Sequence, residues 1–151
     1  MQLTRTADYA IRVMIHLAGL PPGSRASRET LAEWAEVPGE FLAKVLQHLT
    51  RARLIVSHRG TKGGFQLARD TAGISMLEIV EAVEGKTELN VCLSGDAACG
   101  RRGWCPAHVV WKQAQAAMME VLSAATLDKL ACQAFGNASG PVAISGGGRW
   151  S

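Results

Sequence analysis

Two features of membrane and secreted proteins are missing from this sequence. Its longest apolar runs fall far short of the roughly 18 residues needed to cross a bilayer. Its first residues, MQLTRTADYAIR, carry scattered charges, whereas a secretion signal has a basic start followed by an uninterrupted apolar core. We therefore expect a soluble, cytoplasmic protein with no membrane partner. Thiols stay reduced in the cytoplasm, so clustered cysteines there are more readily metal ligands or redox sensors than structural disulfides.

The usual marks of catalysis are missing as well. The 151 residues show no nucleophile–base pair, no glycine motif that would cradle phosphates and no internal repeat. We therefore expect no enzymatic activity and no small-molecule substrate. With 48% hydrophobic residues, the chain can still bury an ordinary core, as one domain or as a small domain with an appendage.

Strong overall charge is also absent, because the net charge is only +3. Whole-chain charge alone therefore does not predict a nucleic-acid partner. Its distribution is more informative: residues 1–70 hold ten Lys or Arg and six Asp or Glu, so this part carries the whole positive surplus. Such a surplus can neutralise phosphates and supply non-specific affinity for DNA.

Three amphipathic helices are predicted in this basic part, at residues 3–20, 27–36 and 40–53. Pro21-Pro22-Gly23 ends the first helix, and Val37-Pro38-Gly39 separates the second from the third. Two helices joined by a short turn that contains glycine are typical of a helix-turn-helix, although another small helical bundle would show the same features.

A β-hairpin is predicted directly after the third helix. Residues 54–56 and 65–67 have the composition of strands, and a glycine-rich turn at residues 59–64 separates them. A hairpin in this place is typical of the wing of a winged helix-turn-helix. We therefore expect a fold that is mainly α with a small β-hairpin, in which residues 1–70 form the DNA-binding domain.

The third helix and the hairpin turn supply the candidate DNA contacts. In a helix-turn-helix the second helix of the motif enters the major groove, where Gln47 can bond adenine and Lys44 can reach guanine. Arginines suit backbone phosphates, which position a protein without specifying sequence. The alternative for any one residue is a solvated helix face. The candidates are Glu40, Lys44, Gln47, His48, Arg51, Arg59, Thr61 and Lys62.

Residues 71–131 are predicted to contain a connecting helix, a cysteine loop and a second, longer helix. Ser75 and Glu78 form a capping box for a helix at residues 76–84. Pro106 begins a helix that runs to about Ser123, and residues 126–130 form one more short helical turn. Residues 132–151 are expected to be a disordered tail, because the sequence after Phe135 is rich in Gly and Ser and has no periodicity.

The cysteine loop holds Cys92, Cys99 and Cys105 among small residues, and His108 follows three residues after the last of them. Thiolates are soft ligands that suit iron–sulfur clusters or zinc. The gaps of six and five residues are longer than those of common structural zinc sites, which favours an iron–sulfur cluster. Zinc and a metal-free thiol switch are the alternatives, and His108 is either a fourth ligand or an ordinary surface histidine.

Taken together, the chain resembles the IscR/NsrR family of winged-helix transcription regulators over nearly all of residues 1–131. The resemblance rests on the opening MQLTRTADYAIRVMIHLA, on the R-G-x-x-G-G turn at residues 59–64 and on three cysteines before a long helix. It implies a homodimer that pairs through that helix and binds palindromic double-stranded promoter DNA. It also implies that an iron–sulfur cluster on Cys92, Cys99 and Cys105 gates DNA binding.

The resemblance leaves the cluster type and the signal open. Members with a 2Fe–2S cluster use three cysteines and a histidine, for which His108 is the candidate. Members that sense nitric oxide hold a 4Fe–4S cluster with three cysteines and an aspartate of the partner subunit, and Asp8 stands at that position. The alternatives are a metal-free winged-helix regulator with a thiol/disulfide switch and, with less support, an iron–sulfur electron carrier.

Overall fold

The computed structural model describes residues 3–95 and 99–136. Helices α1 (Arg5–Gly19), α2 (Arg28–Ala35) and α3 (Gly39–Arg51) are followed by an antiparallel hairpin of β1 (Ile55–His58) and β2 (Gly64–Leu67). Helices α4 (Met76–Glu84), α5 (Pro106–Ala124) and α6 (Leu127–Phe135) complete the fold, together with the short 3₁₀ turns η1 (Thr71–Gly73) and η2 (Val91–Leu93). The predicted class, mainly α with a small β-hairpin, is confirmed.

Local side-chain hydrogen bonds determine where several helices begin. The side chains of Thr4 and Ser27 accept hydrogen bonds from backbone N–H groups in the first turns of α1 and α2, both at 3.1 Å. The predicted capping box is present at α4, where the Ser75 hydroxyl accepts from the Glu78 N–H at 3.2 Å and the Glu78 carboxylate accepts from the Ser75 N–H at 3.0 Å. These caps satisfy N–H groups that have no partner within the helix.

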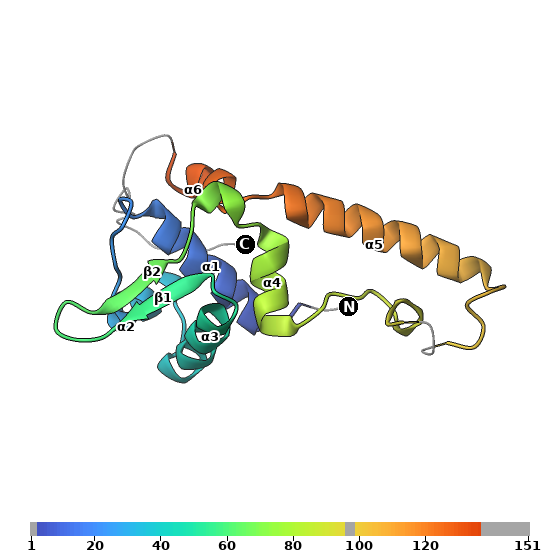
Figure 1. Ribbon diagram of the computed structural model, residues 1–151, viewed down its shortest axis with the longest axis horizontal. Coiled ribbons are helices and arrows are strands. Elements are labelled where there is room, and N and C mark those ends of the chain that lie inside the picture. Colours follow the sequence, from blue (N-terminus) through green and yellow to red (C-terminus); the bar gives the residue numbers. More distant parts are fainter. Residues whose placement is uncertain (1–2, 96–98, 137–151) are drawn as a thin grey trace.

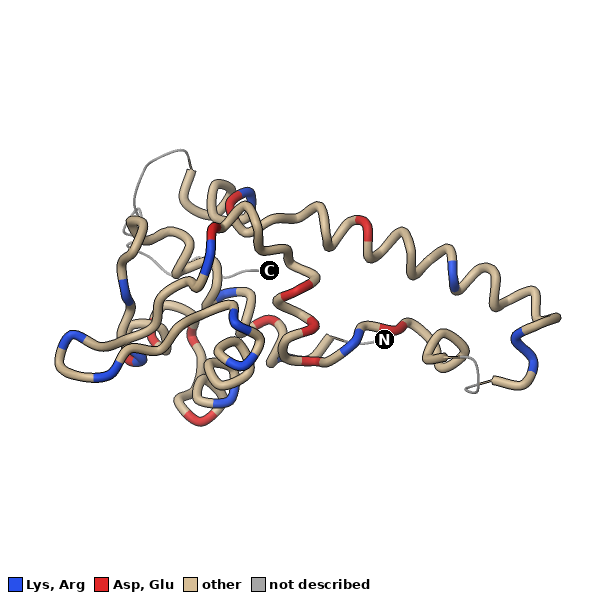
Figure 2. Tube along the Cα trace, in the orientation of Figure 1, with Lys and Arg blue, Asp and Glu red and all other residues tan. Residues whose placement is uncertain are grey.

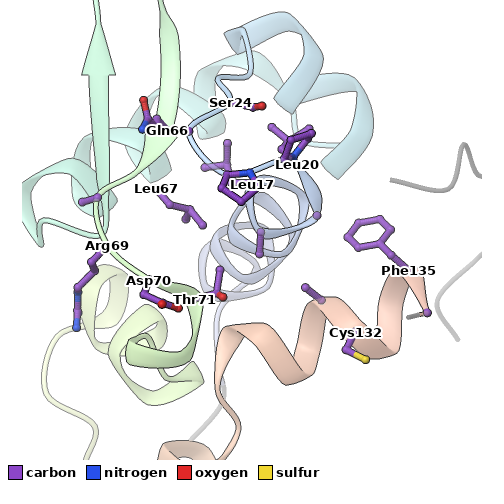
Figure 3. Close-up of a pocket in the computed structure, with 18 residues that line it drawn as sticks. Leu17, Leu20, Ser24, Gln66, Leu67, Arg69, Asp70, Thr71, Cys132 and Phe135 are labelled. Carbon is purple, nitrogen blue, oxygen red and sulfur yellow. The ribbon is translucent and has the colours of Figure 1, made fainter. Parts of the chain in front are cut away.

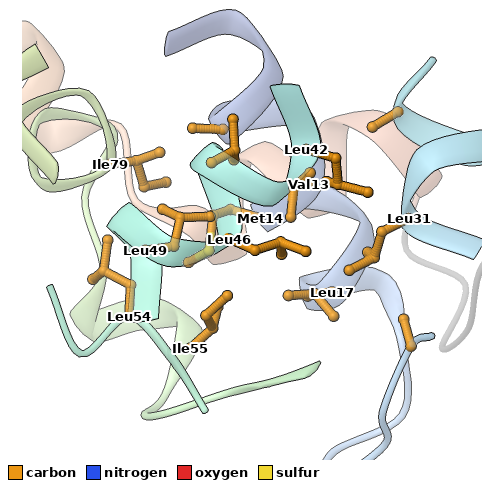
Figure 4. Packing of buried hydrophobic residues seen from close by; sticks show 14 of the residues in the cluster. Val13, Met14, Leu17, Leu31, Leu42, Leu46, Leu49, Leu54, Ile55 and Ile79 are labelled. Atoms are coloured by element: carbon orange, nitrogen blue, oxygen red, sulfur yellow. The ribbon is translucent and has the colours of Figure 1, made fainter. Parts of the chain in front are cut away.

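One hydrophobic core joins the three N-terminal helices to the hairpin and to α4 (Figure 4). Met14 of α1 and Leu49 of α3 are fully buried at its centre, and Leu31 of α2 closes one side. Ile55 at the start of β1 and Ile79 of α4 close the others. Because the leucine stripe of α3 is buried here, the opposite face of the same helix is left to the solvent.

Helix α6 returns to this core, which the sequence did not predict. Its start is held to the start of α4 by two backbone hydrogen bonds of 2.8 Å, from Met76 N–H to Ala125 and from Leu127 N–H to Ile74. Leu127, Ala131 and Phe135 are buried, so α6 packs on α1. Residues 132–135 were predicted to belong to the tail but are helical. Phe135 packs against Gly19 and Trp34, which lie far away in the sequence, and this contact stabilises the helix. Residues 137–151 of the predicted tail lie outside the described residues.

Helix α5 projects away from this body as a long rod, and the cysteine loop lies along its far half (Figure 1). None of its 19 residues is buried. Several large apolar side chains on it are exposed: Val109 by 56%, Val110 by 62%, Trp111 by 40% and Val121 by 68%. Within the part of the chain that the structure describes, no helix is both long enough and apolar enough to span a membrane.

Candidate nucleic-acid interface and cysteine loop

The exposed face of α3 carries the polar residues that the sequence nominated. Glu40, Lys44, Gln47 and Arg51 are exposed and His48 is half-buried, while the leucines of the same helix are in the core. The hairpin turn adds the exposed residues Arg59, Thr61 and Lys62. Figure 2 shows cations on the hairpin turn and along the same side of the body as α3. The structure thus places the predicted DNA-contact residues on two adjacent elements.

The turn between α2 and α3 has a defined backbone conformation. Glu36 ends α2 in the left-handed region, at φ 53°, and Pro38 precedes α3. Two arginines hold this turn from neighbouring helices. Arg28 donates from Nη2 to the Gly39 carbonyl at 2.8 Å, and Arg12 of α1 donates from Nη1 to the Ala35 carbonyl at 3.4 Å. Guanidinium–carbonyl bonds of this kind fix the entry of α3 relative to α1 and α2.

The hairpin is held to the body by the segment before α2. Ala26 exchanges backbone hydrogen bonds with Phe65 of β2, at 3.0 and 2.8 Å, as a short third strand would. Arg25 donates to the Lys62 carbonyl in the hairpin turn at 3.1 Å. Gly64 makes this approach possible, because its φ is +137° and a Cβ there would lie 2.6 Å from the Ala26 oxygen. The wing is therefore anchored at its base and near its tip.

A groove of about 420 Å³ lies between α3 and the hairpin, and we call it the helix–wing groove. It is lined by Arg28, Ala43, Leu46, Gln47, Thr50, Arg51, Ser57 and Phe65. Gln47 and Arg51 were predicted from the sequence as DNA contacts, whereas Arg28, Thr50 and Ser57 were not. Arg28 lies outside both α3 and the hairpin, so only the three-dimensional structure shows that it lines this groove.

A second cavity, of about 620 Å³, lies between the end of α1, the end of β2 and α6 (Figure 3). Leu17, Leu67 and Phe135 line it with apolar groups. At its polar edge, Arg69 donates to the Gly73 carbonyl at 2.7 Å and is paired with Glu78 at 2.5 Å. The polar edge of the cavity therefore stabilises the packing of the segment after β2 against α4. The cavity itself lies away from both the exposed face of α3 and the cysteine loop.

The cysteine loop carries three half-buried thiols between α4 and the first residue of α5. Cys92 lies in η2, Cys99 follows the segment that is not described, and Cys105 is the N-cap residue of α5. The described cysteines form no disulfide. Among the described residues, no three His, Cys, Asp or Glu side chains lie close enough together to bind a metal ion. The three predicted cysteine ligands therefore lie in one loop, but the structure does not bring them into a coordination geometry.

His108 lies one helical turn beyond Cys105, with its backbone N–H donating to the Cys105 carbonyl at 3.1 Å. Its Nε2 accepts a hydrogen bond from Arg102 Nε at 3.4 Å, and its Nδ1 is buried with no hydrogen-bond partner among the described residues. Because Nε2 accepts this bond, the neutral ring carries its proton on Nδ1, and a buried donor without an acceptor is costly. Either ring nitrogen would therefore bind iron only after Arg102 released Nε2. Three thiols and an imidazole are a donor set that fits an iron–sulfur cluster.

Asp8, the other predicted fourth ligand, lies in the first turn of α1 with its side chain 55% exposed. Its carboxylate is paired with Arg12 at 2.8 Å, and the same guanidinium contacts the Ala35 carbonyl. Asp8 therefore connects, through one side chain, to the turn that precedes α3. Within one chain the structure does not group Asp8 with the cysteines.

The segment that leads into the cysteine loop is hydrogen-bonded to two helices, and one of these, α4, is hydrogen-bonded to the cap of α1. The Thr87 N–H donates to the Glu81 carboxylate of α4 at 3.2 Å, and the Leu89 N–H donates to the Gln115 side-chain oxygen of α5 at 2.9 Å. At the end of α4, Glu84 accepts hydrogen bonds from the backbone and hydroxyl of Thr4, the cap of α1. The loop is thereby connected to the N-terminus of the DNA-binding domain.

Within residues 3–95 and 99–136, one titratable side chain is buried inside the body. His16 of α1 is 5% exposed, packs against the Trp34 ring at a centroid distance of 4.7 Å, and has no hydrogen-bond partner for either nitrogen among the described residues. Burial lowers the pKa of His16, because the charged imidazolium loses its hydration. Trp34 in turn packs against Phe135 at 5.7 Å, so these rings join α1, α2 and α6.

A helix-turn-helix with an anchored basic hairpin, carried on one end of a long exposed helix, defines a winged helix-turn-helix transcription regulator. The Rrf2 family model, described as an iron-dependent transcriptional regulator, matches residues 3–133. The chain belongs to the Rrf2 family, which confirms the resemblance to IscR and NsrR regulators drawn from the sequence.

Two related sequences illustrate the relationship. A Mycobacterium tuberculosis protein assigned to the HTH-type transcriptional regulators is 33% identical over 132 residues, which cover 87% of this chain and 81% of the relative. The transcriptional regulator NsrR of Shouchella clausii is 30% identical over 131 residues, covering 86% and 88%. Relatives of this kind support DNA binding and transcription regulation rather than catalysis.

Solved structures show the same architecture. CymR, the global cysteine regulator of Bacillus subtilis, has a TM-score of 0.71 and 25% identity, with 88% of this chain and 98% of CymR covered. IscR of T. potens has a TM-score of 0.71 at 23% identity, covering 89% and 88%, which supports the fold alone. Iron is thus named in the description of the family, and cysteine in the description of one structural relative.

Proposed function

We propose that this protein is a homodimeric transcriptional regulator whose affinity for promoter DNA depends on an iron–sulfur cluster. Cys92, Cys99 and Cys105 hold the cluster, and the fourth ligand is either His108 or Asp8 of the partner subunit. One observation supports this most: three half-buried free thiols lie in the loop between the DNA-binding domain and α5, and the His108 imidazole lies in the first turn of α5. Bound there, the cluster supplies a redox-active and ligand-labile centre.

The homodimer is supported by the surface of α5. Val109, Val110, Trp111 and Val121 expose large apolar areas on a helix that packs on little of its own chain. Val110 and Val121 share one face of the helix, and Val109 and Trp111 flank it. Exposed apolar surface along a helix marks an interaction site, and such a helix pairs readily with a second copy of itself. Two half-sites one DNA turn apart then match the two α3 helices.

The residues of this chain offer a route from the loop to α3. Residues 87 and 89 hold the loop to α4 and α5, and Glu84 of α4 accepts hydrogen bonds from Thr4 at the start of α1. Arg12 connects Asp8 to the carbonyl of Ala35. A ligand that took the Asp8 carboxylate would free Arg12 and so change the support of the turn before α3. Small rotations of the two domains would then weaken both half-site contacts together, which is a population shift between two conformations.

The test is anaerobic purification followed by visible absorption spectroscopy and iron and sulfide quantification. Wild type is expected to be coloured, with stoichiometric iron and sulfide, and each of Cys92→Ala, Cys99→Ala and Cys105→Ala is expected to be colourless. His108→Ala and Asp8→Ala identify the fourth ligand, because only the substitution that removes it alters the spectrum. Cys132→Ala, at an exposed position outside the loop, is the matched control.

The alternatives predict different results in the same samples. A metal-free protein whose three loop cysteines lose reactive thiols on oxidation would instead support the thiol/disulfide switch, for which the CymR relatives are the precedent in fold. A coloured protein that bound no DNA under any condition would support the electron carrier. The signal, whether iron supply, oxygen, nitric oxide or redox state, follows from which treatment bleaches the spectrum.

A further inference from the structure

The cavity beside α6 has the size and composition of a small-molecule site (Figure 3). Ligand sites are clefts of roughly 300–1,000 Å³ with mainly apolar walls and a few polar groups, and this cavity measures about 620 Å³. Its apolar walls come from the ends of α1, β2 and α6: Leu17, Leu20, Leu67 and Phe135. Three elements of the body therefore surround a space that neither the cysteine loop nor the exposed face of α3 uses.

The polar edge of this cavity carries an uncompensated negative charge. Arg69 is neutralised by its ion pair with Glu78, whereas Asp70 has no ion-pair partner among the described residues. Oδ1 of Asp70 accepts a hydrogen bond from the Ala72 N–H at 2.9 Å, which leaves Oδ2 free to accept another. Figure 3 shows the side chains of Asp70 and Thr71 next to each other at this edge. A ligand head group placed here therefore meets hydrogen-bond acceptors and a negative charge.

We propose that this cavity binds a small amphiphilic amine, with its apolar chain against Leu17, Leu67 and Phe135 and its ammonium group at Asp70 and Thr71. Burial of the chain supplies most of the affinity, because each methylene removed from water is favourable. The ammonium donates to Asp70 Oδ2 and to the Thr71 hydroxyl, whereas Asp70 would repel a carboxylate head group. The site goes beyond the proposed function, because it involves neither the cysteines nor α3.

The walls of the cavity continue directly into the contacts that hold the hairpin. Ser24 lines the cavity, and the next two residues, Arg25 and Ala26, hold the hairpin turn and β2. On the other wall, Gln66 lines the cavity, and its neighbour Phe65 exchanges two backbone hydrogen bonds with Ala26. A ligand that packs against both walls therefore stabilises the anchor of the hairpin and changes DNA affinity. This effect on DNA, unlike the site itself, rests on the proposed function.

The test follows backbone amide chemical shifts of the full-length protein by NMR at pH 7 during titration with butylamine, hexylamine and octylamine. Hexanol and hexanoate are probes with the same chain length as hexylamine but a neutral or a negative head group. Ala18→Phe fills the cavity from α1, and Asp70→Asn removes the charge but keeps an oxygen for the Ala72 N–H. Ala134→Phe is the matched control, because Ala134 is also a half-buried helical alanine but does not line the cavity. Circular dichroism melts identify any variant that does not fold.

In wild type, saturable shifts are expected at residues 20–24 and 66–71, with a dissociation constant that falls about fourfold for each added methylene. Hexylamine binds up to about fivefold tighter than hexanol, as the gain from one exposed ion pair allows, and hexanoate binds more weakly than both. Asp70→Asn abolishes the difference between hexylamine and hexanol. Ala18→Phe abolishes binding of all three probes, and Ala134→Phe leaves it unchanged.

The effect on the hairpin has its own readout in the same samples. With hexylamine bound, hydrogen exchange of the Ala26 and Phe65 amides slows in wild type and in Ala134→Phe, but not in Ala18→Phe. Unchanged exchange in the amine-bound wild type would overturn the connection between the cavity and the hairpin.

The site itself fails if none of the three amines produces saturable shifts at the cavity, or if folded Ala18→Phe binds hexylamine as tightly as wild type does. Tighter binding of hexanoate than of hexylamine would overturn the amine as its ligand. These results leave the proposed function intact, because they involve neither the cluster nor DNA. Wild type that bound no DNA would overturn the proposed function and the effect of the amine on DNA affinity, while the shifts at the cavity would still decide the site.

Discussion

Replacing Phe135 by alanine tests whether α6 belongs to the core of the DNA-binding domain. Phe135 is 6% exposed, its ring packs against Trp34 at a centroid distance of 5.7 Å, and it lies so close to Gly19 that a Cβ there would overlap the ring. Removing a buried phenylalanine costs about 3–5 kcal/mol, of which about 0.5–1.5 kcal/mol is attributable to the aromatic pair. Since the ring closes the end of α1, we expect Phe135→Ala to fall within this range.

The measurement is urea unfolding followed by circular dichroism, with the free energy of unfolding obtained by linear extrapolation. Gln133→Ala is the control, because Gln133 is exposed on the same helix and its removal should change stability by less than about 0.5 kcal/mol. A loss below about 1 kcal/mol in Phe135→Ala would refute the packing of α6 on α1. A large loss of unfolding free energy in both variants would mean that the substitutions act on the formation of α6 rather than on the packing of the Phe135 ring.

Three further predictions concern stability and the wing. Burial lowers the pKa of His16, so below about pH 6.5 the unfolded chain protonates this ring while the folded chain keeps it neutral. The free energy of unfolding therefore decreases as the pH is lowered, by at most about 1.4 kcal/mol per pH unit from this group. His16→Leu should remove that part of the pH dependence in urea titrations, and an unchanged profile would contradict it. Ser75→Ala removes the capping box of α4 and should cost about 1 kcal/mol in the same assay, whereas no loss would show that the box is not stabilising. Gly64→Ala places a methyl group against the Ala26 carbonyl at a positive φ and should increase amide exchange at Ala26 and Phe65, while unaltered exchange would contradict the close approach.

The elements with strong local signals were predictable from the sequence. The helix at residues 76–84 matches α4 because its capping box and its glycine stop are local features. The helix-turn-helix and the hairpin were predicted within a few residues, since apolar periodicity and turn residues define them. The exposed polar face of α3 follows from the same periodicity, which is why its candidate residues lie together on the surface.

Features that depend on long-range packing were not predictable. The helix at residues 127–135 was predicted only as a short turn, because its stability comes from α1 and from the Ser75–Thr126 bridge, which no local pattern indicates. Arg28 was missed for the same reason, since its contact with Gly39 spans the turn between two helices. The fourth ligand stays a prediction, because Asp8 and His108 are distinguished by the arrangement of two subunits rather than by spacing within one chain.

The central claim is that the state of the cysteine loop controls DNA affinity. It is tested most directly by titrating a duplex, selected by wild type from a random-sequence pool, with anaerobic, cluster-loaded protein and with the same preparation after the cluster has been removed. The account predicts affinities that differ by about five- to 150-fold, and no difference between the two treatments in Cys99→Ala. Equal affinities of loaded and cluster-free wild type for the same duplex would contradict it.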